Sequence, residues 1–162
     1  DVLRDGLRRF KGVRRRQELR GRPRGIEIIQ DYAHHPTAVR ETVAAIRSRY
    51  PSRRLWALFE AESNTSRRRT FQQAYVEAFV GAEKVIFVKP LEKDDNLPPE
   101  ERIDAARLAR DLAERGIDAR FVPDKDEILE MLKDELRPDD VVLFMSGRDF
   151  LGLPARLVDE LS

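Results

Sequence analysis

Gln30-Asp31-Tyr32-Ala33-His34-His35-Pro36-Thr37 is the stretch of sequence that decides the fold. An apolar run from Ile26 to Ile29 leads into it, and a strongly periodic segment begins at Pro36. The run is typical of a strand, and the periodic segment is typical of a helix with proline in its first turn. This order places an acid, a phenol and two imidazoles at the carboxyl end of a strand. Open α/β sheets bind ligands at that position, helped by the free N–H groups of the next helix.

The alternation of strand and helix continues on both sides of this stretch. A short helix is expected over residues 1–10, and Gly116 is expected to end the helix over 102–115. The expected strands are 13–19, 25–31, 54–60, 84–89, 119–122 and 141–145, with 20–25 as a hairpin link between the first two. The other expected helices are 36–50, 66–80, 125–136 and 150–161.

Repeated strand–helix units with short apolar strands predict a parallel sheet that is covered on both faces. The opening hairpin adds an antiparallel edge. The predicted fold class is therefore α/β, a Rossmann-like three-layer sandwich with a mostly parallel sheet and an antiparallel N-terminal hairpin.

Length and composition narrow the class of protein. The 162 residues are the length of one domain, and 41% apolar with 38% charged residues is typical of a water-soluble globular protein. No apolar stretch approaches the roughly 18 to 20 residues of a membrane span, and the charged start at Asp1 does not resemble a signal peptide. The absence of cysteine excludes disulfides and thiolate chemistry, and a cytoplasmic location is expected.

Charge is unevenly distributed along the chain. Residues 1–24 carry ten Lys or Arg against three Asp or Glu, a net +7, whereas the remainder carries 21 against 27, a net −6. Such a basic arm could hold nucleic acid, phosphate groups or an acidic part of a larger protein. Its only aromatic residue is Phe10, so base stacking has little support and nucleic acid is not an expected partner.

Polar residues follow four of the expected strands, at 31–36, 60–67, 89–90 and 146–150. All carboxyl ends of a parallel sheet lie on one rim, so these segments are expected to be neighbours. Ser63, Asn64, Thr65 and Ser66 either cap the next helix or contact a ligand, and four such residues where one suffices favour a ligand. The loop over 146–149 is either a contact for an anion or a solvated turn.

The acid and the histidines each have two interpretations. Asp31 either caps the following helix or bonds to sugar hydroxyls. His34 and His35 are either polar residues at a helix N-terminus or site residues, and at most one of them is expected to point into the site. No metal site is predicted, because ligands beyond two histidines would have to be Asp or Glu. Arg14-Arg15-Arg16 lies in an expected strand, where side chains alternate between faces.

Three motifs in register resemble the C-terminal domain of the Mur ligases. They are Phe10-Lys11-Gly12-Val13-Arg14-Arg15-Arg16, the 31–37 turn, and Phe59-Glu60 through Ser63-Asn64-Thr65-Ser66-Arg67. The branch with the greatest resemblance is the murein-tripeptide recycling ligases (UDP-N-acetylmuramate:L-alanyl-γ-D-glutamyl-meso-diaminopimelate ligases). The ligases that add L-alanine to UDP-N-acetylmuramate come second.

The resemblance implies one part of an ATP-dependent amide-bond ligase of peptidoglycan synthesis or recycling. An N-terminal domain would hold the UDP-sugar, and a central domain would hold ATP, Mg²⁺ and a catalytic lysine. Residues 1–162 would then form the C-terminal, acceptor-binding domain, and the abrupt start at Asp1 suits an excised domain. The expected partners are UDP-N-acetylmuramate, a peptide or amino acid and the other two domains, without nucleic acid or membrane. No catalytic residue is expected in this domain, and no glycine-rich phosphate loop is present, so the isolated chain is expected to be inactive.

The motifs also imply roles for single residues. The nucleotide side is Arg16, which matches an arginine that reaches phosphates, with Asp31 at the ribose and Tyr32 beside it. The acceptor side is His34, His35, Ser63, Asn64, Thr65 and Arg67.

Two segments depart from the family pattern. Ala61 and Glu62 stand where Pro and Arg are expected, and Ser146-Gly147-Arg148-Asp149 replaces a Ser-Asn-Gly-Gly loop. Glu62 reverses a charge that should face anionic substrate, and Arg148 is a candidate to restore it. The alternative to a ligase domain is a stand-alone α/β ligand-binding module without catalysis. The mixed charges of the rim disfavour a receiver-like module of that kind.

Overall fold

The computed structural model describes Arg4 and residues 13–162. The helix expected over residues 1–10 and the start of the 10–16 motif lie outside the described residues. Six strands form one sheet in the order β1-β2-β6-β3-β4-β5. Their bounds are Glu18–Gly21 (β1), Glu27–Asp31 (β2), Leu55–Phe59 (β3), Lys84–Phe87 (β4), Asp118–Phe121 (β5) and Val141–Met145 (β6). Among the strands of residues 13–162, β1 alone is antiparallel to its neighbour, as the sequence predicts.

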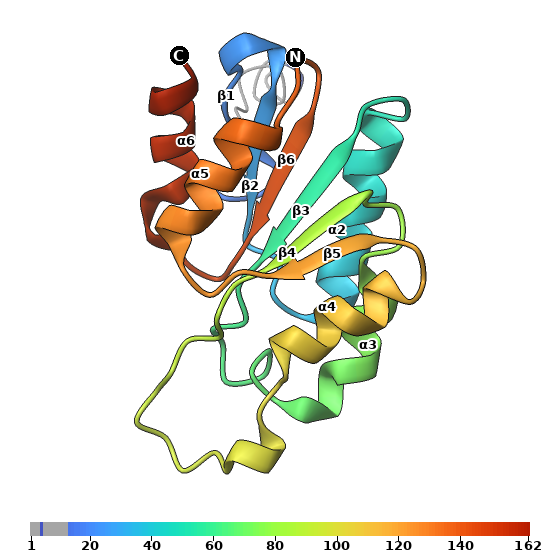
Figure 1. The fold of residues 1–162 in the computed structure, drawn as a ribbon, viewed down its shortest axis with the longest axis vertical. Coiled ribbons are helices and arrows are strands. Elements are labelled where there is room, and N and C mark those ends of the chain that lie inside the picture. The colour runs from blue at the N-terminus through green and yellow to red at the C-terminus, as the bar shows by residue number, and fades with distance from the viewer. Residues whose placement is uncertain (1–3, 5–12) are drawn as a thin grey trace.

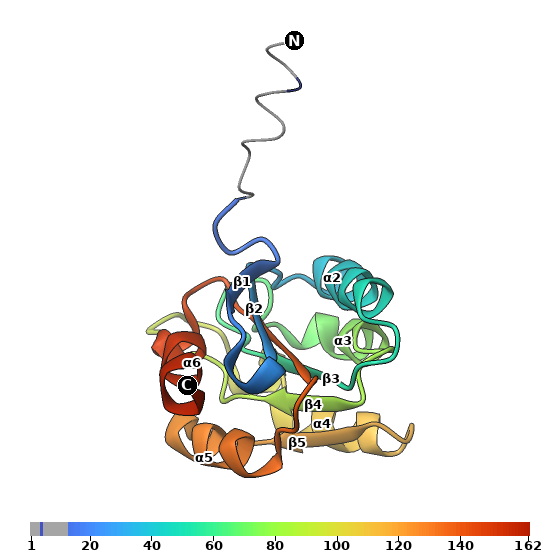
Figure 2. The same ribbon diagram turned by 90° about the horizontal axis from the view of Figure 1, so that it is seen from above.

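Helices cover both faces of the sheet, so the molecule has three layers (Figures 1 and 2). Helices α2 (Pro36–Arg49), α3 (Gln72–Ala78) and α4 (Ala105–Ala113) lie on one face, and α5 (Lys125–Glu135) and α6 (Leu153–Leu161) on the other. Each face has its own apolar cluster, since alternate residues of the central strands point to opposite sides. In β3, for example, Ala57 and Phe59 pack toward α2 and α3, whereas Trp56 and Leu58 pack toward α5 and α6. The predicted fold class is thus confirmed.

The order of the strands creates a switch point in the sheet. From β2 the chain moves outward through β3, β4 and β5 by way of α2, α3 and α4. It then returns through α5 and inserts β6 between β2 and β3 (Figure 1). The loops after β2, β6 and β3 are therefore neighbours. A reversal of strand order of this kind is where doubly wound sheets bind ligands.

The segment before β1 differs from the sequence-based prediction. A strand was expected over 13–19, but β1 begins at Glu18 and the preceding residues form a turn. Arg15 and Gln17 have φ values of 54° and 47°, which a strand does not allow. Their N–H groups donate to the carboxylates of Glu18 (2.7 Å) and Asp31 (2.8 Å), which hold the turn in place. The alternation expected for Arg14-Arg15-Arg16 is therefore wrong.

Two helices begin later than expected. The helix predicted over 66–80 is α3 preceded by a 3₁₀ turn at Arg69–Phe71, and that over 102–115 is α4 with Asp104 as its N-cap. Both segments are held extended by pairing with each other, through a bridge between Arg68 and Arg102 and a 2.8 Å bond from Ile103 N–H to the Arg67 carbonyl. α4 ends at Ala113, two residues before the predicted end. Gly116 follows it in the left-handed conformation, with a φ of 83° and an N–H that donates to the carbonyl of Ala113 (3.0 Å).

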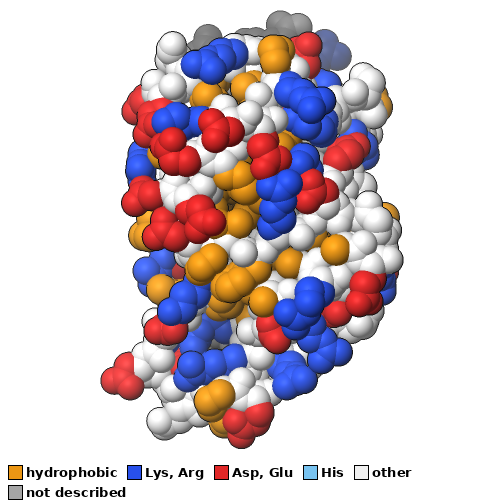
Figure 3. Space-filling model, in the orientation of Figure 1, with side chains coloured by type: hydrophobic (Ala, Val, Ile, Leu, Met, Phe, Trp, Pro, Cys, Tyr) orange, Lys and Arg blue, Asp and Glu red, His pale blue; other side chains and the backbone are white. Residues whose placement is uncertain are grey.

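The face formed by α5 and α6 is a mixture of opposite charges (Figure 3). Lys133 pairs with Glu130 (3.0 Å) and Glu160 (2.8 Å), and Arg156 pairs with Asp126 (2.7 Å). This pattern is typical of a solvated helical layer. None of the described helices is long and apolar enough to cross a bilayer.

Candidate functional site

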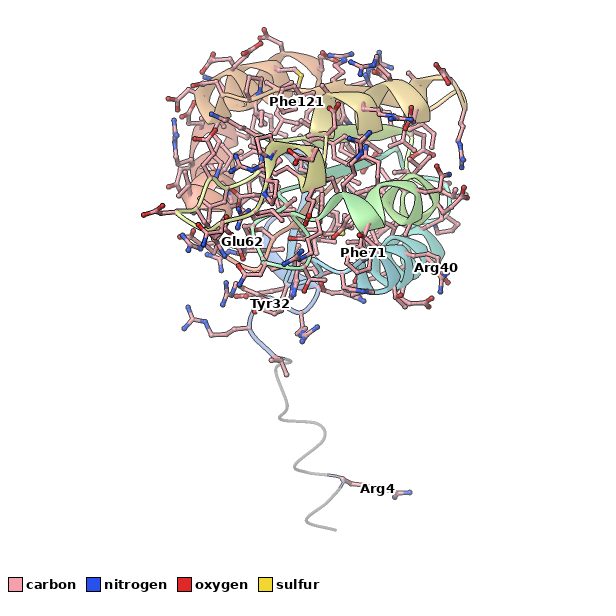
Figure 4. The ribbon with its side chains drawn as sticks, turned by 90° about the horizontal axis from the view of Figure 1, so that it is seen from below. Arg4, Tyr32, Arg40, Glu62, Phe71 and Phe121 are labelled. Atoms are coloured by element: carbon pink, nitrogen blue, oxygen red, sulfur yellow. The ribbon has the colours of Figure 1, made fainter. Side chains whose placement is uncertain are left out.

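The candidate site is the edge of the sheet at the switch point. Three loops meet there: 32–35 after β2, 60–68 after β3 and 146–149 after β6. Figure 4 looks toward this edge and shows Tyr32 and Glu62 on it, from the first and second loops. The site residues that the sequence predicts between positions 31 and 67 lie together at this edge. The 13–17 turn packs beside them.

Asp31 is a buried anchor of this edge. Asp31 is only 4% exposed, and both of its carboxylate oxygens accept hydrogen bonds. Oδ1 accepts from the N–H of Ala33 (2.7 Å) and the hydroxyl of Thr42 (3.4 Å), and Oδ2 accepts from the N–H of Gln17 (2.8 Å). His35, and not Asp31, caps α2, so the capping interpretation of Asp31 is wrong. Its carboxylate instead fixes the turns on either side of it.

Tyr32 organises the basic side of the site. The guanidinium carbons of Arg15 and Arg16 lie 5.3 and 5.5 Å from the centre of its ring, within range of cation–π attraction. Its N–H donates to the carbonyl of Arg15 (2.7 Å), and its ring meets that of His34 edge-on at 5.0 Å. Arg16 is exposed, so its charge is available at this edge.

A cavity of about 500 Å³ adjoins this basic side, between the hairpin and the start of α6. Arg14, Arg15 and Arg20 line it together with Gln30, and Asp149 supplies one opposing charge. The excess of guanidinium groups suits an anionic group such as a phosphate.

The two histidines point apart, as their adjacency predicts. The Nδ1 of His34 is 2.9 Å from the carbonyl of Tyr32, which makes Nδ1 the protonated nitrogen and leaves Nε2 as the acceptor. Tyr75 donates from its hydroxyl to the carbonyl of His34, and burial raises the pKa of Tyr75 well above its ordinary value. His35 is exposed, caps α2 by accepting from the N–H of Thr37 (3.4 Å), and meets the ring of Phe71 edge-on at 5.1 Å.

The four polar residues at positions 63–66 of the β3 loop divide into two pairs. Ser63 and Ser66 bond to each other, hydroxyl to hydroxyl at 2.8 Å, with each backbone N–H donating to the other's oxygen at 2.9 Å. They cap this turn, and not a helix as the sequence suggested. Asn64 and Thr65 are exposed at its tip, where Asn64 accepts from the ammonium of Lys93 (3.0 Å). Within this loop, Asn64 and Thr65 are therefore the accessible members of the predicted acceptor side.

Arg67 is 3% exposed and lies under the loop that follows β4. Its two Nη atoms donate to both oxygens of Asp95, at 2.5 and 2.9 Å. This bidentate contact holds the pKa of Asp95 below its ordinary value. Arg67 thus fastens the 90–99 loop to the edge, a long-range contact that no local sequence pattern could reveal.

A buried polar chain beneath the loops was missed by the sequence analysis. Glu60 accepts from the ammonium of Lys125 (2.8 Å) and from the hydroxyl of Ser146 (2.9 Å), and Ser146 in turn accepts from the N–H of Arg148 (3.1 Å). The ammonium of Lys125 also lies 5.3 Å from the ring centre of Phe150. The chain joins the ends of β3 and β6 to the start of α5.

Glu62 and Arg148, the two departures from the expected motifs, contact each other. The Nε of Arg148 lies 2.7 Å from Oε2 of Glu62. Gly147 makes this contact possible, because a Cβ at that position would lie 2.1 Å from Oε1 of Glu62 and 3.8 Å from Nδ1 of His34. Arg15 donates to the carbonyl of Gly147 (3.2 Å), so all three loops and the 13–17 turn are linked.

Over residues 13–162 no three His, Asp or Glu side chains gather in a way that could hold a metal ion. The arrangement is instead one of positioned charges: guanidinium groups on one side, and an imidazole, a carboxylate and amide or hydroxyl groups on the other. It can hold an anion next to a group that carries or loses a proton.

Comparison with known proteins shows which family this sequence and fold resemble. The family model described as "Mur ligase, glutamate ligase domain" matches residues 15–148. A UDP-N-acetylmuramate–L-alanine ligase of Desulforapulum autotrophicum is 30% identical over 162 residues, which cover 99% of this chain and 35% of that protein.

Two solved structures are also similar. A murein peptide ligase of Psychrobacter arcticus aligns with a TM-score of 0.77 and 26% identity, over 97% of this chain and 32% of that one. A domain from a putative UDP-N-acetylmuramate:L-alanyl-γ-D-glutamyl-diaminopimelate ligase of Haemophilus ducreyi aligns with a TM-score of 0.69 and 23% identity, over 91% of this chain and all of that one.

The chain spans about a third of the length of the curated relative and of the longer solved structure. The matched relatives add different acceptors, so the resemblance to the tripeptide-recycling branch is not confirmed over the L-alanine branch. Because the family model covers most of the chain and the fold agrees, the chain belongs to the Mur ligase family, as its C-terminal domain.

Proposed function

We propose that this chain is the acceptor-binding domain of an ATP-dependent ligase that joins an amino acid or a peptide to UDP-N-acetylmuramate. The observation that carries the proposal is the joining of three loops and the basic 13–17 turn at the switch point. This places cationic and proton-accepting groups on one edge, as an enzyme that brings a phosphorylated carboxylate to an amine requires. UDP-sugar and the catalytic lysine would belong to the other two domains.

The basic side of the edge suits a nucleotide. Arg16 is exposed above Tyr32, and the neighbouring cavity is lined by arginines, which fits phosphate groups. Asp31 would act indirectly, because both of its oxygens hold the protein's own backbone. ATP supplies the phosphoryl group that activates the substrate carboxylate, and Mg²⁺ would be held mainly outside this domain.

The acceptor side suits an amine. In the proposed reaction the amine nitrogen attacks the acyl carbon, the N–C bond forms, the C–O bond to phosphate breaks, and phosphate leaves. The proton released by the amine needs an acceptor. His34 offers Nε2, because its Nδ1 is occupied by the Tyr32 carbonyl. Asn64 and Thr65 would orient the acceptor, and the loops would exclude water from the acyl phosphate.

Within the family we propose the tripeptide-recycling branch. The motif Phe59-Glu60 with Ser63-Asn64-Thr65 supports this assignment, and the Psychrobacter arcticus murein peptide ligase is a structural neighbour. The L-alanine branch is the competing assignment, which the Desulforapulum autotrophicum relative supports.

The test is a ligation assay on the full-length enzyme, with UDP-N-acetylmuramate, ATP and Mg²⁺, in which ADP release is measured with either L-alanine or the murein tripeptide. We expect turnover with the tripeptide, and none from the 162-residue chain alone. His34→Asn should lower kcat/KM by roughly 5- to 150-fold, with the KM for ATP little changed. Absence of ligation with both acceptors would refute the proposed function and leave the stand-alone binding module as the explanation. Turnover with L-alanine alone would refute only the branch.

A further inference from the structure

Strand β5 forms one margin of the sheet and has no strand on its outer side among residues 13–162. The N–H groups of Asp118 and Val122 donate to carbonyls on the β4 side, at 3.3 and 2.9 Å. Successive residues of a strand turn their backbone groups to opposite sides, so Ala119 and Phe121 turn theirs outward. β5 therefore presents backbone donors and acceptors that a further strand could bind.

The opposite margin of the sheet, β1, is protected by irregular backbone. Its pairing with β2 shifts register between Leu19 and Gly21, and the turn before it contains the left-handed residues Arg15 and Gln17. The pairing of β5 with β4, by contrast, runs without a shift along the whole strand. Bulges prevent the addition of strands at sheet margins, so β5 is the margin that is open to a further strand (Figure 2).

The side chains along β5 have a symmetric order. Ile117, Ala119 and Phe121 are half-buried and pack against the apolar cluster of the α2–α4 face. Asp118 and Arg120 lie on the α5 face, and their side chains keep 43% and 39% of their surface exposed. The order is apolar, acid, small, base, apolar. Reversed, this order places an acid opposite a base and an apolar side chain opposite an apolar one.

A second copy of the chain in antiparallel register satisfies all of these groups. With the two Ala119 residues opposite each other at a two-fold axis, each Ala119 N–H donates to the carbonyl of the other. Asp118 of one copy then faces Arg120 of the other, and Ile117 faces Phe121. Moving the axis by one residue would oppose two Arg120 or two Asp118 side chains, which is unfavourable. The charges therefore select a single register.

We propose that β5 joins two copies of this domain edge to edge, in a two-fold antiparallel pairing centred on Ala119. The contact consists of one short strand and the side chains beside it, so the pair exchanges with the single chain. The site edge stays accessible, because Phe121 lies on the side of the molecule away from Tyr32 (Figure 4). The pairing is independent of the reaction proposed above, and its tests involve no ligation.

The first experiment follows the mass of the 162-residue chain by sedimentation over a range of chain concentrations. The parent should change from one copy to two, without larger species, because a two-fold contact closes on itself. Asp118→Lys and Arg120→Glu each oppose like charges in both cross-strand pairs, and each should stay single where the parent is paired. An equimolar mixture of the two variants should pair again, because the new lysine faces the new glutamate and the unaltered Arg120 faces the unaltered Asp118.

Arg40→Glu is the matched control, the same charge reversal at an exposed position of α2, and it should leave the pairing unchanged. Thermal melting checks that each variant is folded, since the β5 variants also lose contacts with Lys84 or Glu135. A mixture of folded variants that stays single would overturn the inference. So would a parent chain that never exceeds the mass of one copy, or one that forms species larger than two.

The second experiment uses the absence of cysteine from the chain. Ala119→Cys places a thiol at the two-fold axis, where directly opposed residues have Cα atoms about 5.5 Å apart, within the span of a disulfide. Mild oxidation should join two copies through position 119. Val80→Cys is the control, because Val80 is 62% exposed and lies outside β5. It should give at least about tenfold less cross-linked chain, since no pairing brings its thiols together.

A backbone variant separates the pairing from the charges. Ala119→Pro removes the outward N–H at the axis, which the pairing with β4 does not use, and proline is tolerated at such a position of an edge strand. Ala119→Ser keeps the N–H and should pair like the parent, whereas the proline variant should stay single. If the proline variant pairs as the parent does, or if Val80→Cys cross-links as readily as Ala119→Cys, β5 does not join two copies and the inference is wrong.

Discussion

At the scale of single residues, the geometry of the site edge depends on positions where the neighbouring atoms allow little change of side chain. Gly147 is the clearest case. Its φ does not require glycine, so its role is the space that it leaves for the carboxylate of Glu62. Gly147 thus shapes the site through the space that it leaves, and not through a contact of its own side chain.

Gly147→Ala should therefore displace Glu62 and weaken binding of the acceptor, with destabilisation of about 1–3 kcal/mol from overpacking. In the double variant Glu62→Ala/Gly147→Ala the methyl group has room, so the stability cost of Gly147→Ala should largely disappear. The measurement is a double-mutant cycle by urea unfolding. Additive costs would show that Gly147 is required for another reason.

Asp31 is a second residue whose effect we expect to be structural. Asp31→Ala leaves the N–H groups of Gln17 and Ala33 without their acceptor, which should cost about 1–3 kcal/mol of unfolding free energy. The 13–17 turn carries Arg16, so nucleotide binding should weaken as a consequence. His35→Ala is the comparison, since His35 is exposed and should cost less. A stable Asp31→Ala chain with impaired ATP use in the full-length enzyme would favour direct ribose contact instead.

At the scale of elements, the turn between β6 and α6 has an unusual backbone. Phe150, Leu151 and Gly152 have φ values of 58°, 52° and 73°, so three successive residues are left-handed. Phe150 is fully buried and its ring packs edge-on against Phe144 at 5.3 Å, which offsets the strain. Leu151 has no such compensation, because it is 67% exposed.

Leu151→Gly should consequently stabilise the chain by up to about 1 kcal/mol, because glycine removes the Cβ that a left-handed backbone disfavours. Leu151→Ala keeps the Cβ and should leave the stability nearly unchanged. Thermal melting of the two variants compares them directly. A lower melting temperature for Leu151→Gly than for Leu151→Ala would mean that the turn is not strained at this position.

At the scale of the whole molecule, a charged cluster closes the edge of the sheet opposite the site. Lys84 at the start of β4 pairs with Asp118 (2.6 Å) and Glu135 (3.0 Å), and Arg120 pairs with the same two acids. The contact with Lys84 lowers the pKa of Asp118, and the contact with Arg120 lowers that of Glu135. The cluster ties β4 and β5 to the end of α5.

Lowered pKa values of acids give a definite sign to the pH dependence. The ion pairs of Asp118 and Glu135 contribute their full share of the unfolding free energy above the unfolded-state pKa values near 4. That share is lost as the pH falls through the lower folded-state pKa values. The melting temperature should therefore fall in acid. In Glu135→Gln the difference between the melting temperatures at pH 7 and pH 3 should be smaller than in the parent chain. Glu114→Gln is the control, because Glu114 is exposed directly after α4, and it should leave this difference unchanged. An unchanged difference in Glu135→Gln would show that the cluster contributes no stability.

The sequence predicted what depends on local pattern. The strand at 141–145 and the helix starts at Pro36 and Lys125 agree with the structure, because apolar periodicity and capping residues are local signals. The left-handed 13–17 turn was missed, since arginine and glutamine do not indicate a positive φ. The pairs Arg67–Asp95 and Glu62–Arg148 join distant segments, and no spacing rule connects them. The position of the candidate edge could thus be predicted from the sequence, but the contacts between its loops could not.

The insertion of β6 between β2 and β3 has a consequence for how the chain folds. Until residues 141–145 have emerged from the ribosome, the β1–β2 hairpin and the β3–β4–β5 sheet have no strand to join them. Both pieces expose an apolar strand edge that is open to non-native pairing, and the high contact order of the final step makes it slow. We therefore expect the ligand-binding edge to form last in synthesis, and a nascent chain that ends before β6 to depend on chaperones.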